Sequence, residues 1–245
     1  MKFKSFAKIN LCLDVLKKDK SGYHIIQTVF HEVKDLYDEV EILNSKKDEI
    51  IINAPISSSE NLAYRALKLL KKELKIKKCA KIKISKNIPI SSGLGGGSSN
   101  AATVLKGLNK MWNLKLPKKK LLEMAKSLGM DVPFFIIGGT VYGENFGEKL
   151  TRLKPVKNII FTIHSKADFT DTAKTAKKYK KLKLKNCGKF TEKTKKLLKA
   201  ILLGDTKNII KNLHSDFETI ANPATKIPKN HHLSGAGPTT FTATR

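Results

Sequence analysis

The chain has 245 residues and a formal net charge of +27, and 40% of its residues are hydrophobic, a length and composition that suit one two-lobed domain or two small ones. It contains no run of 18 apolar residues, and its first residues lack the apolar core and cleavage site of a signal peptide, so we expect neither a membrane span nor secretion. Cys12, Cys79 and Cys187 lack C-x-x-C spacing, which argues against a disulfide framework or a zinc site and suits a reducing cytoplasm.

The first half of the chain predicts several strands, one helix and then a glycine-rich stretch. Residues 60–74 carry apolar side chains at helical spacing. The glycine-rich stretch covers 89–102, and Ser98 or Ser99 is expected to cap the helix after it, whose apolar face runs to Trp112. Alternation of apolar and polar residues predicts strands at 3–16, 23–33, 38–44, 49–53 and 81–88.

The second half predicts mostly helices, with a strand near each end. Pro117 suits the first turn of a helix that Gly129 ends. The Lys-rich residues 174–196 are expected to be the most mobile part of the chain. Strands are predicted at 158–164 and 239–244, helices at 171–181, 191–203 and 205–213, and a second glycine turn at 234–238.

The glycine-rich stretch predicts an anion site, because glycines let the backbone approach a phosphate and a helix N-terminus offers free N–H groups. It is not a Walker A loop, since Gly97 is followed by Ser98 and not by lysine. It is not a dinucleotide fingerprint either. Gly93 and Gly95 fit that pattern, but Ser98 replaces the third glycine, and residues 117–120 offer no carboxylate for a ribose. A phosphate-binding loop of another kind remains, with a plain flexible turn as the alternative.

The same stretch resembles the ATP loop of the GHMP kinases, a family that includes galactokinase, homoserine kinase and mevalonate kinase. Within that family it is most similar to the branch whose members phosphorylate 4-diphosphocytidyl-2-C-methyl-D-erythritol. Further blocks of the branch follow in its order, covering most of residues 1–150 and the tail. They are AKINL at 7–11, GYH at 22–24, NL at 61–62, GMDVPFF at 129–135 and LSGAGP at 233–238.

The resemblance implies an α+β fold with two lobes and the active site in the cleft between them. The ATP-binding lobe would cover residues 1–150, and a C-terminal lobe, shortened relative to the family, would cover 151–245. ATP and Mg²⁺ would be the cofactors, and the ATP γ-phosphoryl would pass to the 2-hydroxyl of 4-diphosphocytidyl-2-C-methyl-D-erythritol in non-mevalonate isoprenoid synthesis. We expect a cytoplasmic monomer or weak dimer that binds this small molecule.

The residues expected to bind ATP are those of the glycine loop together with Asn61, which the resemblance places near the adenine. Ser98 and Ser99 can bond a phosphate or Mg²⁺, or simply cap the helix, and Ser99 is the candidate metal ligand. The loop residues are Pro89, Ile90, Ser91, Ser92, Gly93, Leu94, Gly95, Gly96, Gly97, Ser98 and Ser99.

Two residues are candidates for catalysis. Asp131 stands between Gly129 and Pro133, where it could equally cap the turn, and the resemblance implies that it is the catalytic base. Lys8 lies inside an apolar strand, and in so lysine-rich a chain its side chain could simply face solvent. The resemblance implies that Lys8 pairs with Asp131, keeps that carboxylate ionised and stabilises developing negative charge.

The acceptor is expected to contact Asn10, Tyr23 and His24. An aromatic ring next to an imidazole suits a pyrimidine base, although the pair could also be an ordinary strand start. The resemblance implies that Tyr23 and His24 hold the cytosine. A second aromatic on the other side of the cytosine could be Phe169 or Tyr179.

The chain departs from the family pattern in three places. Ser91 and Ser92 stand where the family usually has glycine or alanine. The segment between Glu218 and Leu233 is short, and the last strand stops early, at Arg245. We expect these departures to affect the C-terminal lobe and substrate affinity more than the Lys8–Asp131 chemistry.

The positive charge leaves two interpretations open. One is a nucleic-acid surface, so a basic RNA-binding protein is the alternative from another class. However, the chain has only three arginines: Arg65, Arg152 and Arg245. Surfaces that bind nucleic-acid phosphates in a bidentate manner or recognise base edges usually use arginine. We therefore expect no dedicated nucleic-acid partner. Another GHMP kinase, for mevalonate or homoserine, is the nearer alternative.

Overall fold

A computed structural model describes residues 1–20, 24–165, 182, 191–220 and 227–245. The chain divides into two compact units, and β1 (Lys2–Lys18) and β2 (His24–Ser45) contribute residues to both. Across the described ranges, no helix is long and apolar enough to cross a bilayer. Unit 1 comprises residues 1–7, 33–88 and 95–137, and unit 2 comprises residues 8–32, 89–94 and 138–245.

Unit 1 is built on a sheet in the order β3 (Glu49–Ile52), β4 (Cys79–Ser85), β2 and β1. β4 runs antiparallel to β2, with Val40 opposite Ile84, and parallel to β3. Successive strand residues point to opposite faces, so the buried Val40 and Ile84 share one face with the helices.

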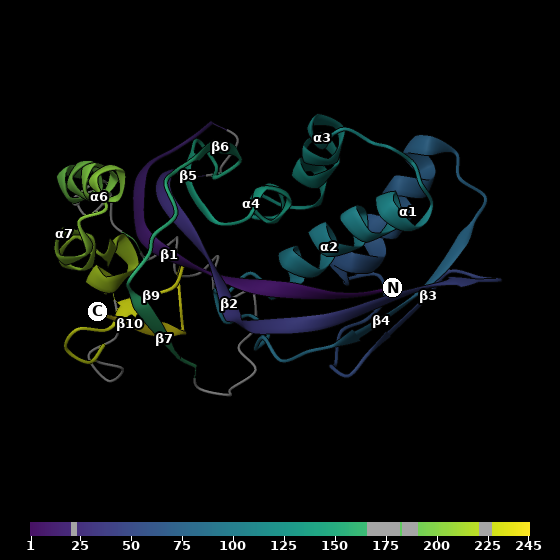
Figure 1. Cartoon of the computed structure of the whole chain (residues 1–245), viewed down its shortest axis with the longest axis horizontal. Helices are drawn as coiled ribbons and strands as arrows, with labels where there is room; N and C mark the ends of the chain where they lie inside the picture. The colour runs from purple at the N-terminus through teal and green to yellow at the C-terminus, as the bar shows by residue number, and fades with distance from the viewer. Residues whose placement is uncertain (21–23, 166–181, 183–190, 221–226) are drawn as a thin grey trace. The chain divides into compact units, whose positions relative to one another are not determined.

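Helices α1 (Leu62–Leu74), α2 (Gly96–Met111) and α3 (Lys118–Leu128) lie over one face of this sheet (Figure 1). A Cβ on Gly107 of α2 would come 2.5 Å from Ile42 Cδ1, so the glycine lets this helix pack directly on β2. A short helix, α4 (Val132–Ile137), ends the unit.

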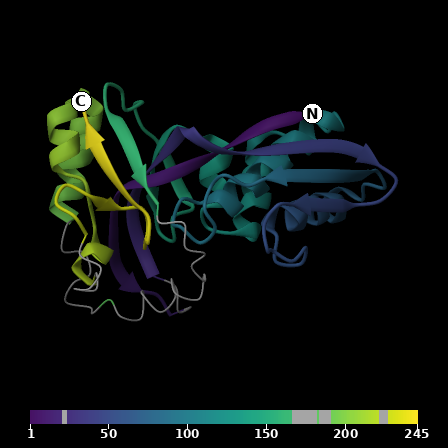
Figure 2. The ribbon, with the colours of Figure 1, turned by 90° about the horizontal axis from the view of Figure 1, so that it is seen from below.

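Unit 2 contains two sets of strands. In one, β5 (Thr140–Glu144) pairs with β2 and with β6 (Lys149–Arg152), and β8 (His214–Ser215) runs parallel to β1. In the other, β10 (Thr240–Thr244) lies between β7 (Ile160–His164) and β9 (His232–Leu233), and Figure 2 shows β10 in yellow beside β7 in green. The helices of this unit are α6 (Thr191–Leu203), α7 (Thr206–Lys211) and the 3-10 helix η2 (Asp216–Ile220).

The core of unit 2 joins the second half of β1 to residues from late in the chain. Leu13 and Val15 pack in one cluster with Phe217, Leu233 and Ala236. This packing explains why the two compact units differ from the contiguous halves, 1–150 and 151–245, that the sequence suggests. Residues 8–32 belong with 138–245, because β1 is buried against β8 and η2.

Most predicted elements appear within two or three residues of their expected bounds, and the differences have physical reasons. The two strands predicted at 23–33 and 38–44 form one continuous strand, β2, in which Asp38 is fully buried and held by hydrogen bonds. The helix after the glycine loop begins at Gly96, so the prediction of a cap at Ser98 or Ser99 was wrong. Gly95, at φ 72°, occupies the cap position instead. The predicted helix at 171–181 lies outside the described residues, as does most of the segment 174–196.

Candidate active site

The glycine loop that precedes α2 turns through three left-handed residues. Ser91, Gly93 and Gly95 have φ values of 54°, 83° and 72°. Two of them are glycines, which adopt this conformation at no steric cost, whereas Ser91 adopts it under strain. Ser92 stabilises the turn, because its hydroxyl donates to Pro89 O at 2.7 Å and is 3.4 Å from Leu94 N. Ser92 is thus a structural residue of the loop.

The tail turn 234–237 packs against this loop. A Cβ on Gly93 would come 2.3 Å from Ser234 O, a distance that no side chain tolerates. Ser234 Oγ donates to Gly93 O at 3.0 Å, and Thr239 N donates to Ser92 O at 3.3 Å. The second glycine motif of the sequence therefore holds the first one in place within unit 2.

The N-terminus of α2 presents open backbone donors. By helix geometry the first N–H groups, those of Gly96, Gly97 and Ser98, have no partner inside the helix, and the helix dipole favours negative charge there. Gly97 is exposed, and the nearest atom to a Cβ on it would be Leu62 Cδ1 at 3.8 Å. This end of α2 fits a phosphate group, because the backbone is open at the position where an anion would lie.

The two serines of the helix start differ in surroundings. Ser98 is half-buried, whereas Ser99 is 2% exposed and its hydroxyl accepts a hydrogen bond from Ser5 Oγ at 2.7 Å. In the part of the chain that the structure describes, no group of three His, Cys, Asp or Glu side chains could hold a metal ion. A metal contact from Ser99 stays a prediction.

Asn61 lies at the start of α1, close to the N-terminus of α2. Its Oδ1 accepts from Ala63 N at 2.9 Å and thereby caps α1, and the residue is 6% exposed. Its neighbour Leu62 is the residue nearest to Gly97. The adenine contact expected of Asn61 is untested, but the residue stands beside the helix end that suits the phosphates.

Lys8 does not face solvent. It is 3% exposed, and its Nζ donates to Asn10 Oδ1 at 2.7 Å. Asn10 Nδ2 donates in turn to Thr28 Oγ1 at 2.7 Å, and Thr28 donates to Cys12 O at 2.6 Å. This chain of bonds fixes the amide so that its oxygen faces the ammonium group. Asn10 therefore orients Lys8, whether or not it also touches a substrate.

The tail turn also approaches Lys8. A Cβ on Gly235 would lie 3.6 Å from Lys8 Nζ and 3.5 Å from Asn10 Oδ1. Lys8 N donates to Leu94 O at 2.9 Å, so the strand that carries the lysine is bonded to the glycine loop. Unit 2 thus gathers Lys8, Asn10, the loop residues 89–94 and the tail turn at one place.

Asp131 belongs to unit 1, where it is half-buried and directly precedes α4. Val132 N donates to Gly129 O at 3.1 Å, and Pro133 occupies the first turn of the helix, which suits its fixed φ. Residues 132–136 that follow it are buried, so the half-buried Asp131 stands at the edge of a buried segment. The pairing of Asp131 with Lys8 stays a prediction, since the two residues lie in different units.

Of the predicted cytosine-binding pair, the structure describes His24, which is half-buried at the start of β2. Burial, and then the charge of Lys18, lowers the pKa of the His24 imidazole below its ordinary value. A neutral ring can both donate and accept, as recognition of a pyrimidine requires. Tyr23, Phe169 and Tyr179 lie outside the described residues.

Two residues that the sequence interpretation missed support this site. Thr28 holds Asn10, and Ser234 holds Gly93. A signal for Ser234 was present, because it opens the tail glycine turn, whereas Thr28 is an ordinary strand residue that no motif marks.

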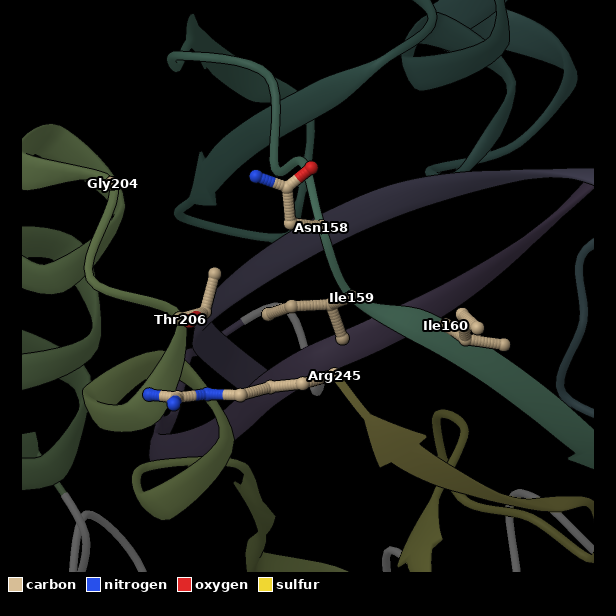
Figure 3. Close-up of a pocket in the computed structure, with 6 residues that line it drawn as sticks. All are labelled: Asn158, Ile159, Ile160, Gly204, Thr206 and Arg245. Atoms are coloured by element: carbon tan, nitrogen blue, oxygen red, sulfur yellow. The ribbon is translucent and has the colours of Figure 1, made fainter.

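A surface hollow of about 630 Å³ in unit 2 is separate from these residues (Figure 3). It lies between the start of β7, the link from α6 to α7 and the end of β10. Among the predicted site residues that the structure describes, none lines it, and we assign it no role in the chemistry. Its lining residues are Asn158, Ile159, Ile160, Gly204, Thr206 and Arg245.

Comparison with known proteins agrees with the class that these features indicate. Residues 61–139 match the family model of the GHMP kinases N terminal domain, a range that includes the phosphate end of α2 and Asp131. Solved structures of GHMP kinases share the fold. A 4-(cytidine 5'-diphospho)-2C-methyl-D-erythritol kinase has a TM-score of 0.70 at 24% identity, covering 98% of this chain and 89% of its own. Phosphomevalonate kinase from Streptococcus pneumoniae has a TM-score of 0.74 at 13% identity, covering 100% of this chain and 91% of its own. The α+β fold class is thus confirmed.

Curated relatives narrow the class further. A 4-diphosphocytidyl-2-C-methyl-D-erythritol kinase from Caldicellulosiruptor saccharolyticus is 39% identical over 98% of this chain and 87% of its own. One from Clostridium tetani is 40% identical over 90% of this chain and 78% of its own. The chain is a GHMP kinase and belongs, within that class, to the family of 4-diphosphocytidyl-2-C-methyl-D-erythritol kinases.

Proposed function

We propose that this protein transfers the γ-phosphoryl group of ATP to the 2-hydroxyl of 4-diphosphocytidyl-2-C-methyl-D-erythritol, releasing ADP and the 2-phosphate. The observation that supports this most directly is the identity of 39% over 98% of the chain with a kinase named for that substrate. The reaction is one step of non-mevalonate isoprenoid synthesis, and we expect it to take place in the cytoplasm.

Different residues of the chain would carry out different parts of phosphoryl transfer. The N–H groups at the start of α2 would bind the phosphates, and Asn61 would contact the adenine. Asp131 would accept the proton of the attacking hydroxyl, and Lys8, held by Asn10, would stabilise the negative charge that develops as the oxygen attacks. Mg²⁺, arriving with ATP, would neutralise phosphate charge.

The acceptor would bind through its cytosine at Tyr23 and His24. Neutral His24, whose pKa burial keeps low, supports this role. Mevalonate and homoserine carry no pyrimidine, so a cytosine site distinguishes this proposal from the rival kinase activities. Solved homoserine and mevalonate kinases share the fold at 19% and 17% identity. They support the fold alone, so the choice of acceptor rests on the relatives of higher sequence identity.

Replacing Asp131 tests the proposed base. We expect Asp131→Asn to lower kcat by about 10²-fold to 10⁴-fold, because a general base contributes rate enhancement of that size. Binding of a nonhydrolysable ATP analogue should be unchanged, because the variant keeps the side chain's shape. Turnover like that of the wild type, measured by ADP release with the cytidine substrate, would show that Asp131 is not the base.

A further inference from the structure

We propose that Asp38, a buried carboxylate on β2, is a positioning residue for ATP, because it fixes the two backbone segments of unit 1 that flank the glycine loop. This inference rests on the proposed kinase function and adds a residue that no motif of the sequence marks.

Asp38 first anchors the chain where it leaves β4 toward the loop. Its Oδ1 accepts from the backbone N–H groups of both Asn87 and Ile88, each at 2.8 Å. Asp38 itself is 0% exposed, and Ile88 is 1% exposed. Two backbone donors on one buried oxygen fix the direction in which the chain enters the loop.

The other oxygen of Asp38 reaches the far side of the loop. Oδ2 accepts a short hydrogen bond from Lys86 Nζ and another, at 2.9 Å, from Asn100 Nδ2 in the first turns of α2. Asn100 Nδ2 is also 2.9 Å from Ser5 Oγ, and Ser5 donates to Ser99. One carboxylate is thereby bonded to the residues before the loop and to the helix that follows it.

Lys86 lies next to Gly96, the first residue of α2, at the helix end that is proposed to bind the phosphates. A Cβ on Gly96 would come 2.8 Å from Lys86 Nζ and 3.0 Å from Ile88 Cγ2. Burial lowers the pKa of the Lys86 ammonium, while the charge of Asp38 opposes that shift. The backbone of Gly96 therefore rests on a side chain whose position Asp38 sets.

The consequence for ATP follows from preorganisation. Donor groups bind an anion well only when they already point at it, and displacement of the helix start by a fraction of an ångström weakens all of its N–H contacts together. Loss of the Asp38 bonds should therefore affect ATP binding first, while the residues that meet the acceptor hydroxyl keep their chemistry.

Asp38→Asn tests the inference, because the new amide keeps the shape of the carboxylate. Its oxygen can still accept from Asn87 and Ile88, but its NH₂ group would face the donors Lys86 and Asn100. We expect the KM for ATP to rise about tenfold or more, with a smaller change in kcat and in the KM for the acceptor.

Asp48→Asn is the matched control. The side chain of Asp48, 7% exposed, is also in unit 1, and it accepts from Lys71 at 2.7 Å, from Lys68 at 3.1 Å and from the backbone of Ala80 at 3.3 Å, all of them away from the loop. The variant should lose stability in thermal unfolding and keep its KM for ATP. If both variants weaken ATP binding equally, or if neither does, Asp38 is a structural residue only and the inference fails.

A double variant distinguishes the loss of the pairing between Asp38 and Lys86 from a general loss of stability. In Asp38→Asn/Lys86→Gln the glutamine oxygen can accept from the asparagine amide, so we expect part of the ATP affinity to return. Titration with a nonhydrolysable ATP analogue gives the same comparison without turnover. If the wild type binds the analogue but phosphorylates no acceptor, the proposed function fails and the titration still decides the role of Asp38.

Discussion

Gly93 is the residue at which the two glycine motifs, residues 89–99 and 234–238, pack against each other. Its φ of 83° and the carbonyl of Ser234, 2.3 Å from where a Cβ would stand, both require a residue without a side chain. Gly97, by contrast, is exposed, and a Cβ on it would make an ordinary contact with Leu62 Cδ1 at 3.8 Å. The protein's own packing requires the first glycine, whereas a phosphate-binding role for the second stays a prediction.

Alanine substitutions should separate these two kinds of glycine. We expect Gly93→Ala to lower the free energy of unfolding by several kcal/mol, about 1–2 from the left-handed conformation and more from the clash. Gly97→Ala should leave stability equal or raise it by about 0.5–1 kcal/mol, because alanine favours the helix, while ATP affinity falls. Denaturant unfolding and ATP titration check both variants, and a stable Gly93→Ala protein would contradict the packing described here.

At the scale of elements, a buried polar cluster joins β1, α6 and β8. His214 Nε2 is 3.0 Å from Asp14 Oδ1, and His214 Nδ1 is 2.8 Å from the carbonyl of Asn212. Thr194 of α6 donates a short hydrogen bond to the other oxygen of Asp14. Thr194 Oγ1 is also 3.2 Å from His214 Nε2, so the three side chains form one connected set of contacts. Burial of the neighbouring Cys12 raises the pKa of its thiol to about 12.

Removal of one member of the cluster should destabilise the protein strongly. We expect His214→Ala to cost about 1–3 kcal/mol or more, because it leaves the fully buried Asp14 without one of its hydrogen-bond partners. The pair of Lys195 with Glu192 on the same helix offers a contrast, since both side chains are 73% exposed. Lys195→Ala should change urea unfolding little. Equal effects of the two variants would refute the role of the cluster.

The sequence predicted elements well where one short-range pattern decides the structure. The helix at 191–203 appears with the predicted bounds, because its apolar spacing is uninterrupted. The sequence did not predict that 23–33 and 38–44 form a single strand, because Lys34 and Asp35 interrupt the alternation and Asp38 looks like a turn residue. Only the tertiary hydrogen bonds from Lys86, Asn87, Ile88 and Asn100 make a buried aspartate acceptable there.

The motifs of the candidate site could be recognised in the sequence, but the hydrogen bonds that position their side chains could not. A solvent-facing Lys8 was one of the two interpretations that the sequence left open. The structure buries its side chain, whose Nζ donates to Asn10, and Asn10 donates to Thr28, 18 residues further along. Ser91 and Ser92 depart from the glycine or alanine that the family usually has in this loop. The structure gives Ser92 a turn-stabilising bond and leaves Ser91 strained at φ 54°, a conformation that the sequence alone does not indicate.

For the whole molecule, the excess of lysine shapes what the surface attracts. Where the chain is described, several lysines pair with carboxylates, as Lys47 and Lys81 do with Glu49. With 48 basic and 21 acidic residues, most of the positive charge is uncompensated. Such a field draws in anionic ligands, and ATP and a cytidine diphosphate ester are both anions. The absence of a dedicated nucleic-acid partner and a monomeric or weakly dimeric state remain predictions.

ADP release measured with a panel of acceptors tests the central claim most directly. With ATP and Mg²⁺ supplied, we expect turnover with 4-diphosphocytidyl-2-C-methyl-D-erythritol and none above background with mevalonate, homoserine or no acceptor. Turnover that prefers mevalonate or homoserine would contradict the proposed substrate, and no turnover with any acceptor would contradict the proposed kinase activity.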